Sequence, residues 1–216
     1  MKKWFCLLLA CLLLLPAASP AKGETPADIR VLLRRLYLTD RADLTLAGRY
    51  LVRSASGAEL LLSDGAKVTV RLQDHQLILF SGGVSSVLGK TCSLLRQDSG
   101  DTVPGIRFNL QAGFYPGDLS LSIEEDKIVP VLTLPLETYL QGVVPYEMGD
   151  GFPEEALKAQ AVCARTYALN HMNSASAWDV VDTTNDRFSA ESPRTARGPS
   201  GRWRTLPGSC SPATES

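Results

Sequence analysis

Histidine is scarce in this 216-residue sequence, which contains only His75 and His171, and neither a Cys-x-x-Cys nor a His-x-x-x-His spacing occurs. Metal centres built on those two spacings are therefore not predicted. A zinc site made from Cys163, His171 and one remote ligand is the single alternative that stays open. We expect no bound metal and no cofactor.

An excess of charge of either sign is also missing. The chain has 22 Lys and Arg residues against 23 Asp and Glu residues, a net charge of -1. A nucleic-acid-binding protein normally carries a strongly basic surface, because phosphates dominate that interaction. We therefore expect no nucleic acid among the partners of this protein.

Cysteine is too sparse for a disulfide framework. Two of the five cysteines, Cys6 and Cys11, lie in the N-terminal apolar segment, which leaves Cys92, Cys163 and Cys210. An odd number of widely spaced cysteines does not predict paired bridges. Cys163 lies among alanines in a helical pattern, where we expect it to be a small buried hydrophobic residue.

A long apolar run is the last absent feature. Residues 4–15 are apolar, follow two lysines and precede the small residues of segment 16–21. This run is shorter than the roughly 20 residues that span a bilayer. Residues 1–21 are predicted to be a signal peptide, with cleavage near Ala18 or Ala21. An uncleaved N-terminal membrane anchor is the alternative, and in either case the rest of the chain works outside the cytoplasm.

Residues 29–135 have the pattern of β-structure. Short segments alternate apolar and polar residues with a period of two, as half-buried strands do, and turns containing Gly, Asp or Pro separate them. This pattern predicts a mostly antiparallel sheet system with no chemistry of its own. The predicted strands are 29–34, 44–52, 68–72, 76–80 and 119–124, with turns at 74–75 and 115–118.

The periodicity changes at Pro135. Leu136, Tyr139, Leu140 and Val143 fall on one face of a helix. Gly142 and a proline three residues later predict that this helix is short. A shaped loop over 145–152 is expected to follow, and it carries one carboxylate, Glu147.

A second helix is predicted from Pro153 to about Met172. It is rich in alanine, which favours the helix and leaves small faces that other elements can approach closely. We therefore expect it to be central in the domain. Its polar residues fall in pairs seven positions apart, which share a side of the helix. These pairs are Lys158 with Arg165 and Gln160 with Tyr167.

Two blocks of this helical segment resemble the SpoIID/LytB family, the bacterial stage II sporulation protein D and its relatives. They are residues 136–148, LETYLQGVVPYEM, and residues 155–169, EALKAQAVCARTYAL. The preceding β region, with FYPGDL at 114–119, is similar in order to the first half of the family. The resemblance implies an α+β fold, in which an antiparallel β-rich part is followed by a helix-loop-helix catalytic segment.

The family resemblance implies peptidoglycan glycan strands as the substrate and lytic transglycosylase chemistry in sporulation or cell-wall remodelling. It implies Glu147 as the catalytic acid, a role that one carboxyl group can fill. Apolar, partly desolvated surroundings would keep the acid form near neutral pH, and Val143, Val144, Tyr146, Met148 and Phe152 are the expected source. The residues that match the motif and are expected to bind substrate or position the loop are Lys158, Gln160, Arg165 and Tyr167.

LytB-type members are instead modifiers of an autolytic amidase, so the resemblance leaves activity open. The alternatives are a non-catalytic wall-binding modifier, which could contact other cell-wall hydrolases, and an inactive fragment. The family also implies a location outside the bacterial cytoplasmic membrane, secreted or attached to its outer face. Contact with the membrane is expected only through the N-terminal segment.

The resemblance ends in the C-terminal part of the chain. Residues 187–216 contain no Val, no Ile and a single Leu, with many Ser, Pro, Arg and Gly residues. Such a composition predicts disorder, because too little apolar surface is available to offset the chain entropy. We expect an incomplete SpoIID-like domain over 28–184, a truncation that would leave strand edges exposed, and a non-family tail over 185–216.

Overall fold

Two β-sheets and two α-helices make up the fold of the computed structural model, which describes residues 28–97, 103–109, 111–149 and 151–183. The helices are α2 (Leu136–Met148) and α3 (Glu154–His171), with a short 3-10 helix η1 (Arg34–Leu36). The strands are β1 (Asp28–Leu32), β2 (Arg41–Ala47), β3 (Tyr50–Ser54), β4 (Glu59–Leu62), β5 (Lys67–Gln73), β6 (Gln76–Ser81), β7 (Val84–Gly89), β8 (Thr91–Arg96), β9 (Gly105–Phe108), β10 (Asp118–Glu124), β11 (Lys127–Pro135) and β12 (Val180–Val181).

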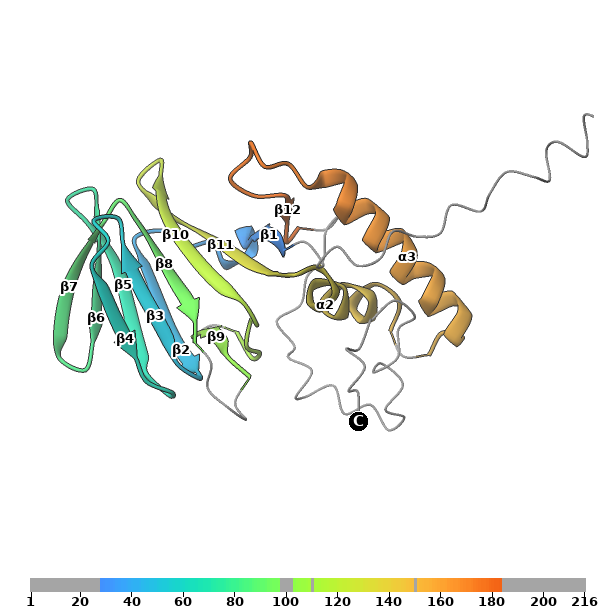
Figure 1. The fold of residues 1–216 in the computed structure, drawn as a ribbon, viewed down its shortest axis with the longest axis horizontal. Coiled ribbons are helices and arrows are strands. Elements are labelled where there is room, and N and C mark those ends of the chain that lie inside the picture. The colour runs from blue at the N-terminus through green and yellow to red at the C-terminus, as the bar shows by residue number, and fades with distance from the viewer. Residues whose placement is uncertain (1–27, 98–102, 110, 150, 184–216) are drawn as a thin grey trace, which may run out of the picture.

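The larger sheet has the strand order β12-β1-β11-β10-β8-β3-β4, and the smaller sheet has the order β7-β6-β5-β2-β9. All pairings are antiparallel except that of β1 with β12, which brings the end of the described chain beside its beginning. Figure 1 shows the sheets at one end of the molecule and the two helices at the other, beyond β11 and β1. The predicted α+β class, with antiparallel sheets followed by helices, is confirmed.

Most predicted strands form where the alternation placed them. The segment 68–72 lies in β5, 76–80 in β6 and 119–124 in β10. The turn between β5 and β6 is also confirmed, because Asp74 and His75 both have positive φ, 50° and 55°. Two consecutive residues of this kind form the hairpin turn whose twist matches the flanking strands.

One predicted strand was wrong. Segment 44–52 is divided between β2 in the smaller sheet and β3 in the larger sheet. Gly48 lies between them with φ of 76°, a conformation that glycine adopts at little cost. Its N–H donates to the Asp64 carboxylate at 2.6 Å. Alternation continues through this crossing, so periodicity alone could not reveal it.

The hydrophobic core is continuous from the sheets into the helices. Leu119 and Leu132 of the larger sheet and Leu44 of the smaller sheet belong to one buried cluster with Tyr139 and Leu140 of α2. β11 runs directly into α2, so the last strand of the sheet determines where this helix begins. The predicted apolar face of α2 is therefore the face that anchors it.

The predicted signal peptide or anchor at 1–21 and the predicted tail at 185–216 lie outside the described residues. The domain boundaries 28–184 stay a prediction. None of the helices in the described part of the chain has the length and apolar character needed to cross a membrane.

Candidate functional site

Glu147 lies in the last turn of α2 and not in a loop, so the predicted loop over 145–152 was wrong at its start. The helix continues through Pro145 to Met148. Proline has no N–H and disturbs the helix one turn before it, but here few residues of the helix remain beyond it. Buried Leu140 and Val144 hold the preceding turn against the core, and the N–H of Gly149 donates to the Pro145 carbonyl at 2.9 Å.

The side-chain amide of Gln160 on α3 donates a hydrogen bond from Nε2 to Oε2 of Glu147. The two residues are thirteen positions apart and come from different helices. The structure therefore brings together the predicted catalytic acid and one of the four residues predicted to assist it. Because the amide occupies one carboxyl oxygen, the other oxygen, Oε1, is oriented away from this contact.

Arg165 joins the same two helices at their other end. Its Nε donates to Oε1 of Glu137 at 2.8 Å, and its Nη2 donates to Oε2 at 2.9 Å. This paired geometry is the strongest form of Arg–carboxylate contact. The hydrogen bond to Glu137 raises the pKa of Arg165 above its ordinary value, against the opposing effect of desolvation. Arg165 thus holds α3 against α2, and its predicted part in the site stays a prediction.

Lys158 forms ion pairs within α3, and Tyr167 contacts His171 of the same helix. The Lys158 ammonium lies 3.1 Å from Glu154 and 2.9 Å from Glu155, both in the first turn of the helix. Hydrogen bonds to Glu155 and then Glu154 raise the pKa of Lys158. The ring of Tyr167 stacks on His171, with centroids 3.9 Å apart. Their predicted part in substrate binding stays a prediction.

The apolar surroundings expected for Glu147 are not provided by the described residues. Val143 and Val144, one turn before Glu147, are buried in the core, while Tyr146 and Phe152 are 43% and 51% exposed. Glu147 itself is exposed. The reason is that apolar residues adjacent to Glu147 in sequence point in different directions around the helix. The candidate site is therefore an open surface.

The expectation of a central α3 with a buried Cys163 was also wrong. Cys163 is exposed, and among the described residues of this helix only Ala161 and Ala168 are fully buried. Ala161 and Ala168 are seven positions apart and share one face of the helix, so the small side chains pack closely on that face alone. In the part of the chain that the structure describes, no group of three or more His, Cys, Asp or Glu side chains lies close enough to hold a metal ion.

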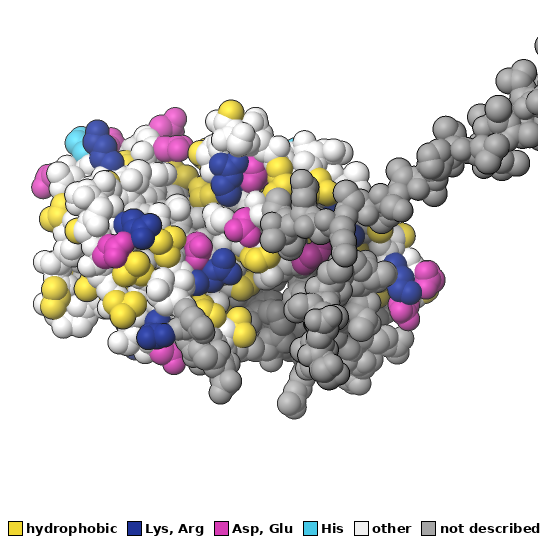
Figure 2. Space-filling model, in the orientation of Figure 1, with side chains coloured by type: hydrophobic (Ala, Val, Ile, Leu, Met, Phe, Trp, Pro, Cys, Tyr) yellow, Lys and Arg dark blue, Asp and Glu magenta, His cyan; other side chains and the backbone are white. Residues whose placement is uncertain are grey.

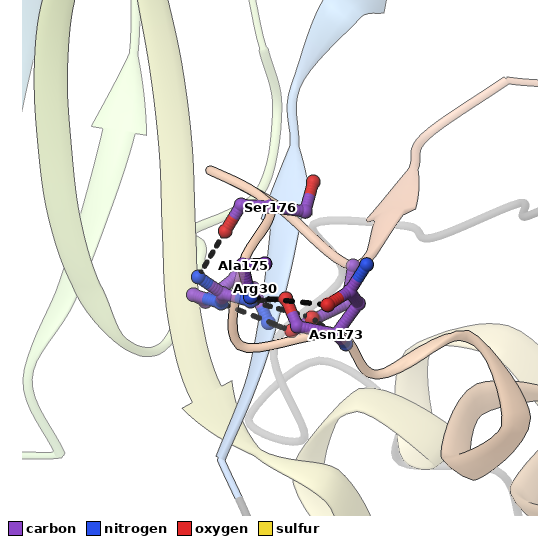
Figure 3. Close-up of polar contacts among 5 residues, drawn as sticks. Arg30, Asn173, Ala175 and Ser176 are labelled. Carbon is purple, nitrogen blue, oxygen red and sulfur yellow. Dashed lines mark hydrogen bonds and ion pairs between the residues drawn. The ribbon is translucent and has the colours of Figure 1, made fainter.

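The loop after α3 is attached to β1 through Arg30, which the sequence analysis did not single out. Its guanidinium donates to both carboxylate oxygens of Asp179, from Nη2 at 2.7 Å and from Nε at 3.2 Å. It also donates to the carbonyls of Ser176 and Asn173 (Figure 3). A sequence signal existed, because Asp179 and Asp182 flank two valines, but no local pattern identifies their partners.

Asp182 was missed as well and is one of the two polar residues among the buried described residues, at 1% exposure. Its carboxylate accepts the backbone N–H of Arg35 at 3.0 Å. Desolvation raises the pKa of Asp182, although Arg35 and Arg34 act in the opposite direction. The Arg35 guanidinium lies over the ring of Tyr146, 5.9 Å from its centroid. Thus η1 reaches the last turn of α2, where Glu147 lies.

Fold and site together define an α+β protein in which one helix presents Glu147, hydrogen-bonded to Gln160 of a second helix, beside antiparallel sheets. Residues 124–199 match the family model described as SpoIID, stage II sporulation protein. This segment, which contains α2, α3 and β12, belongs to the SpoIID family, as the two sequence blocks predicted.

The chain is also similar to an uncharacterized protein of Brachyspira hyodysenteriae, with 46% identity over 74 residues. The match covers 32% of this chain and 20% of that protein, so the chain spans about a fifth of the length of the curated relative it matches. No solved structure matches this chain.

Proposed function

We propose that this protein is a lytic transglycosylase of SpoIID type, in which Glu147 cleaves the bond between MurNAc and GlcNAc in peptidoglycan glycan strands. The observation that carries the proposal is the hydrogen bond from Gln160 to Glu147, made between two helices of the SpoIID segment. A solvated surface glutamate does not need a partner from a second helix. A carboxyl group that must meet a glycosidic oxygen benefits from being held in one orientation.

The reaction uses the same carboxyl group twice. Protonated Glu147 gives its proton to the glycosidic oxygen as the bond from that oxygen to C1 of MurNAc breaks. The carboxylate then accepts the proton of the MurNAc 6-hydroxyl, whose oxygen bonds to C1 and closes the 1,6-anhydro ring. Glu147 is protonated again at the end, and no water is consumed. One carboxyl group therefore suffices, in contrast to the pair used in glycoside hydrolysis.

Gln160 and Arg165 act as positioning residues in this mechanism. Gln160 occupies Oε2 of Glu147 and leaves Oε1 to exchange the proton with the glycan. Arg165 holds α3 at the distance from α2 that this contact requires. Because Glu147 is exposed, water must be excluded by the bound glycan itself, which would cover the open surface around the carboxyl group.

The test is digestion of purified peptidoglycan with the full chain, followed by mass spectrometry of the soluble products. We expect 1,6-anhydro-MurNAc ends, and we expect Glu147→Gln to reduce their rate of formation by at least about 100-fold. Glu59→Gln is the matched control, since Glu59 is also exposed and also accepts a hydrogen bond from one side chain, that of Arg53, far from the helices. Equal rates for the parent and Glu147→Gln would refute the proposed role of Glu147.

A positioning role for Gln160 predicts a particular kinetic signature. Gln160→Ala should lower kcat about tenfold with little change in KM, because the contact orients the acid and does not bind the substrate. A rise in KM alone would instead place Gln160 in direct contact with the glycan.

A wall-binding modifier without catalytic activity is the second candidate, and the openness of the Glu147 surface favours it. Tyr146 and Phe152 are large, exposed side chains within five residues of Glu147 in the sequence, and exposed aromatic rings are suited to binding a polymer. Retention of the parent protein on peptidoglycan without any anhydro product would support this function. Retention should then be unaffected by Glu147→Gln.

A further inference from the structure

We infer that Arg35, supported by Arg34, forms an anion subsite beside Glu147 that binds a carboxylate of the wall polymer. The inference rests on the proposed function for the identity of the polymer, but the subsite itself is defined by contacts between η1 and the last turn of α2. Two sources of the carboxylate share this chemistry. One is the lactyl group of MurNAc, and the other is a stem peptide attached to it.

The position of Arg35 places this cation next to the candidate acid. Its guanidinium lies over the ring of Tyr146, and Tyr146 and Glu147 are consecutive residues of α2, with Cα atoms about 3.8 Å apart. Because consecutive side chains of a helix point in different directions, a polymer several sugar units long is the kind of ligand that can contact both the Tyr146 ring and the Glu147 carboxyl group. Both Arg35 and Tyr146 are exposed, so the contact is accessible from solvent.

The contact with the ring leaves the guanidinium able to bind a carboxylate. At 5.9 Å from the centroid it is within range of a cation–π interaction, which does not use its N–H donors. An arginine held in this way loses less conformational freedom when it binds, because one orientation is already favoured. Two of its edge donors match the two oxygens of a carboxylate.

Other cations in this half of the molecule already have acidic partners. Arg30 pairs with Asp179, Lys158 with two glutamates of its own helix, and Arg165 with Glu137. Among the residues that the structure describes, Arg34 and Arg35 have no carboxylate within ion-pair distance of their side chains. On the face that Figure 2 shows, several basic side chains lie next to acidic ones. An unneutralised arginine pair beside a candidate acid is a reasonable site for an external anion.

Asp182 lies beneath this pair and explains how η1 is held. Its buried carboxylate accepts the Arg35 backbone N–H, so it fixes the main chain while the guanidinium remains outside. The one buried negative charge of Asp182 offsets only part of the two positive charges of Arg34 and Arg35. The subsite is thus a rigid support with an exposed cation, which suits weak and selective binding to a polymer.

The experiment compares three soluble polymers in binding to the full chain carrying Glu147→Gln, which prevents turnover. They are glycan strands stripped of stem peptides, strands that retain them, and a neutral chitin oligosaccharide without carboxylates. We expect Arg35→Gln to weaken binding of at least one carboxylated polymer about tenfold, the loss typical of one charge-assisted contact. Binding to the chitin oligosaccharide should not change.

Loss on the stripped strands identifies the lactyl carboxylate, and loss confined to peptide-bearing strands identifies the stem peptide. Arg71→Gln is the matched control, since Arg71 also lies over an aromatic ring, that of Phe80 at 5.6 Å, but on the smaller sheet. It should leave all three affinities unchanged, and Arg35→Lys should restore only part of the lost affinity.

Three results would overturn the subsite: unchanged binding in Arg35→Gln, an equal loss on chitin, or no binding of any carboxylated polymer by the Glu147→Gln protein. The transglycosylase proposal is tested separately, by turnover of peptidoglycan by the parent protein. Anhydro products together with unchanged Arg35→Gln binding would refute the subsite alone. Carboxylate-selective loss without anhydro products would refute only the transglycosylase.

Discussion

The ion pair between Glu137 and Arg165 should contribute measurably to the attachment of α3. Among the described residues of this helix only Ala161 and Ala168 are fully buried, so apolar burial gives α3 little hold on the rest of the fold. The pair makes two charge-assisted hydrogen bonds, and its side chains are 30% and 23% exposed. Bonds of this kind contribute about 1.5–3 kcal/mol when protected from solvent. Discounted for partial exposure, we expect a coupling energy of about 1–2 kcal/mol.

The coupling energy is measured with a double-mutant cycle of Glu137→Ala, Arg165→Ala and the double variant. Each protein is unfolded in urea, and hydrogen exchange is followed at the amides of α3. Loss of either partner should speed exchange in α3 about tenfold and leave the β5–β6 hairpin unchanged, because the helix opens locally. The ion pair of Arg53 with Glu59, whose side chains are 52% and 46% exposed, provides the control cycle. That cycle should give less than about 0.5 kcal/mol.

Equal coupling energies for the two pairs would refute this reasoning. It would mean that partial burial and paired geometry do not distinguish Glu137–Arg165 from a solvated surface pair. Faster exchange throughout the sheets would refute it differently, because α3 would then open only with global unfolding. In either case the proposed positioning of Gln160 by the helix pair would lose its support.

Three further predictions follow from other contacts. Asp179→Asn should lower the free energy of unfolding by about 2 kcal/mol at pH 7. Desolvation raises the pKa of Asp179, but hydrogen bonds from the Arg30 side chain and from backbone N–H groups lower it overall. The stabilisation therefore exists above the ordinary pKa of 3.8, and the variant and parent should converge in stability as the pH falls below that value. Gly117→Ala should destabilise the protein by about 2 kcal/mol or more in urea unfolding, because the φ of Gly117 is 147° and an added Cβ would lie 2.7 Å from a backbone carbonyl oxygen. The control Gly151→Ala, with open space around it, should be neutral or slightly stabilising. A maleimide should modify Cys163 in the native protein but Cys92 only after unfolding, because Cys163 is exposed and burial raises the pKa of the Cys92 thiol to about 12. If peptide mapping finds both cysteines modified at the same rate, the packing of α3 and of the core is contradicted.

The sequence by itself determined the local features of this protein. Alternation in segments 68–72 and 119–124 was sufficient to predict β5 and β10, because a strand places successive side chains on opposite faces regardless of its partners. The i, i+3, i+4 spacing that begins at Leu136 likewise predicted the buried face of α2. The two family blocks identified the SpoIID segment, which the family comparison confirmed.

The tertiary structure decided what depends on contacts between distant residues. Periodicity continues across Gly48 although the chain changes sheets there, and a proline did not end α2, whose preceding turn is held by core packing. The hydrogen bond of Gln160 with Glu147 depends on how α2 and α3 cross, and the contact of Arg30 with Asp179 joins residues 149 positions apart. Such pairs have no local signature in the sequence, because their free energy depends on the geometry that folding of the whole chain creates.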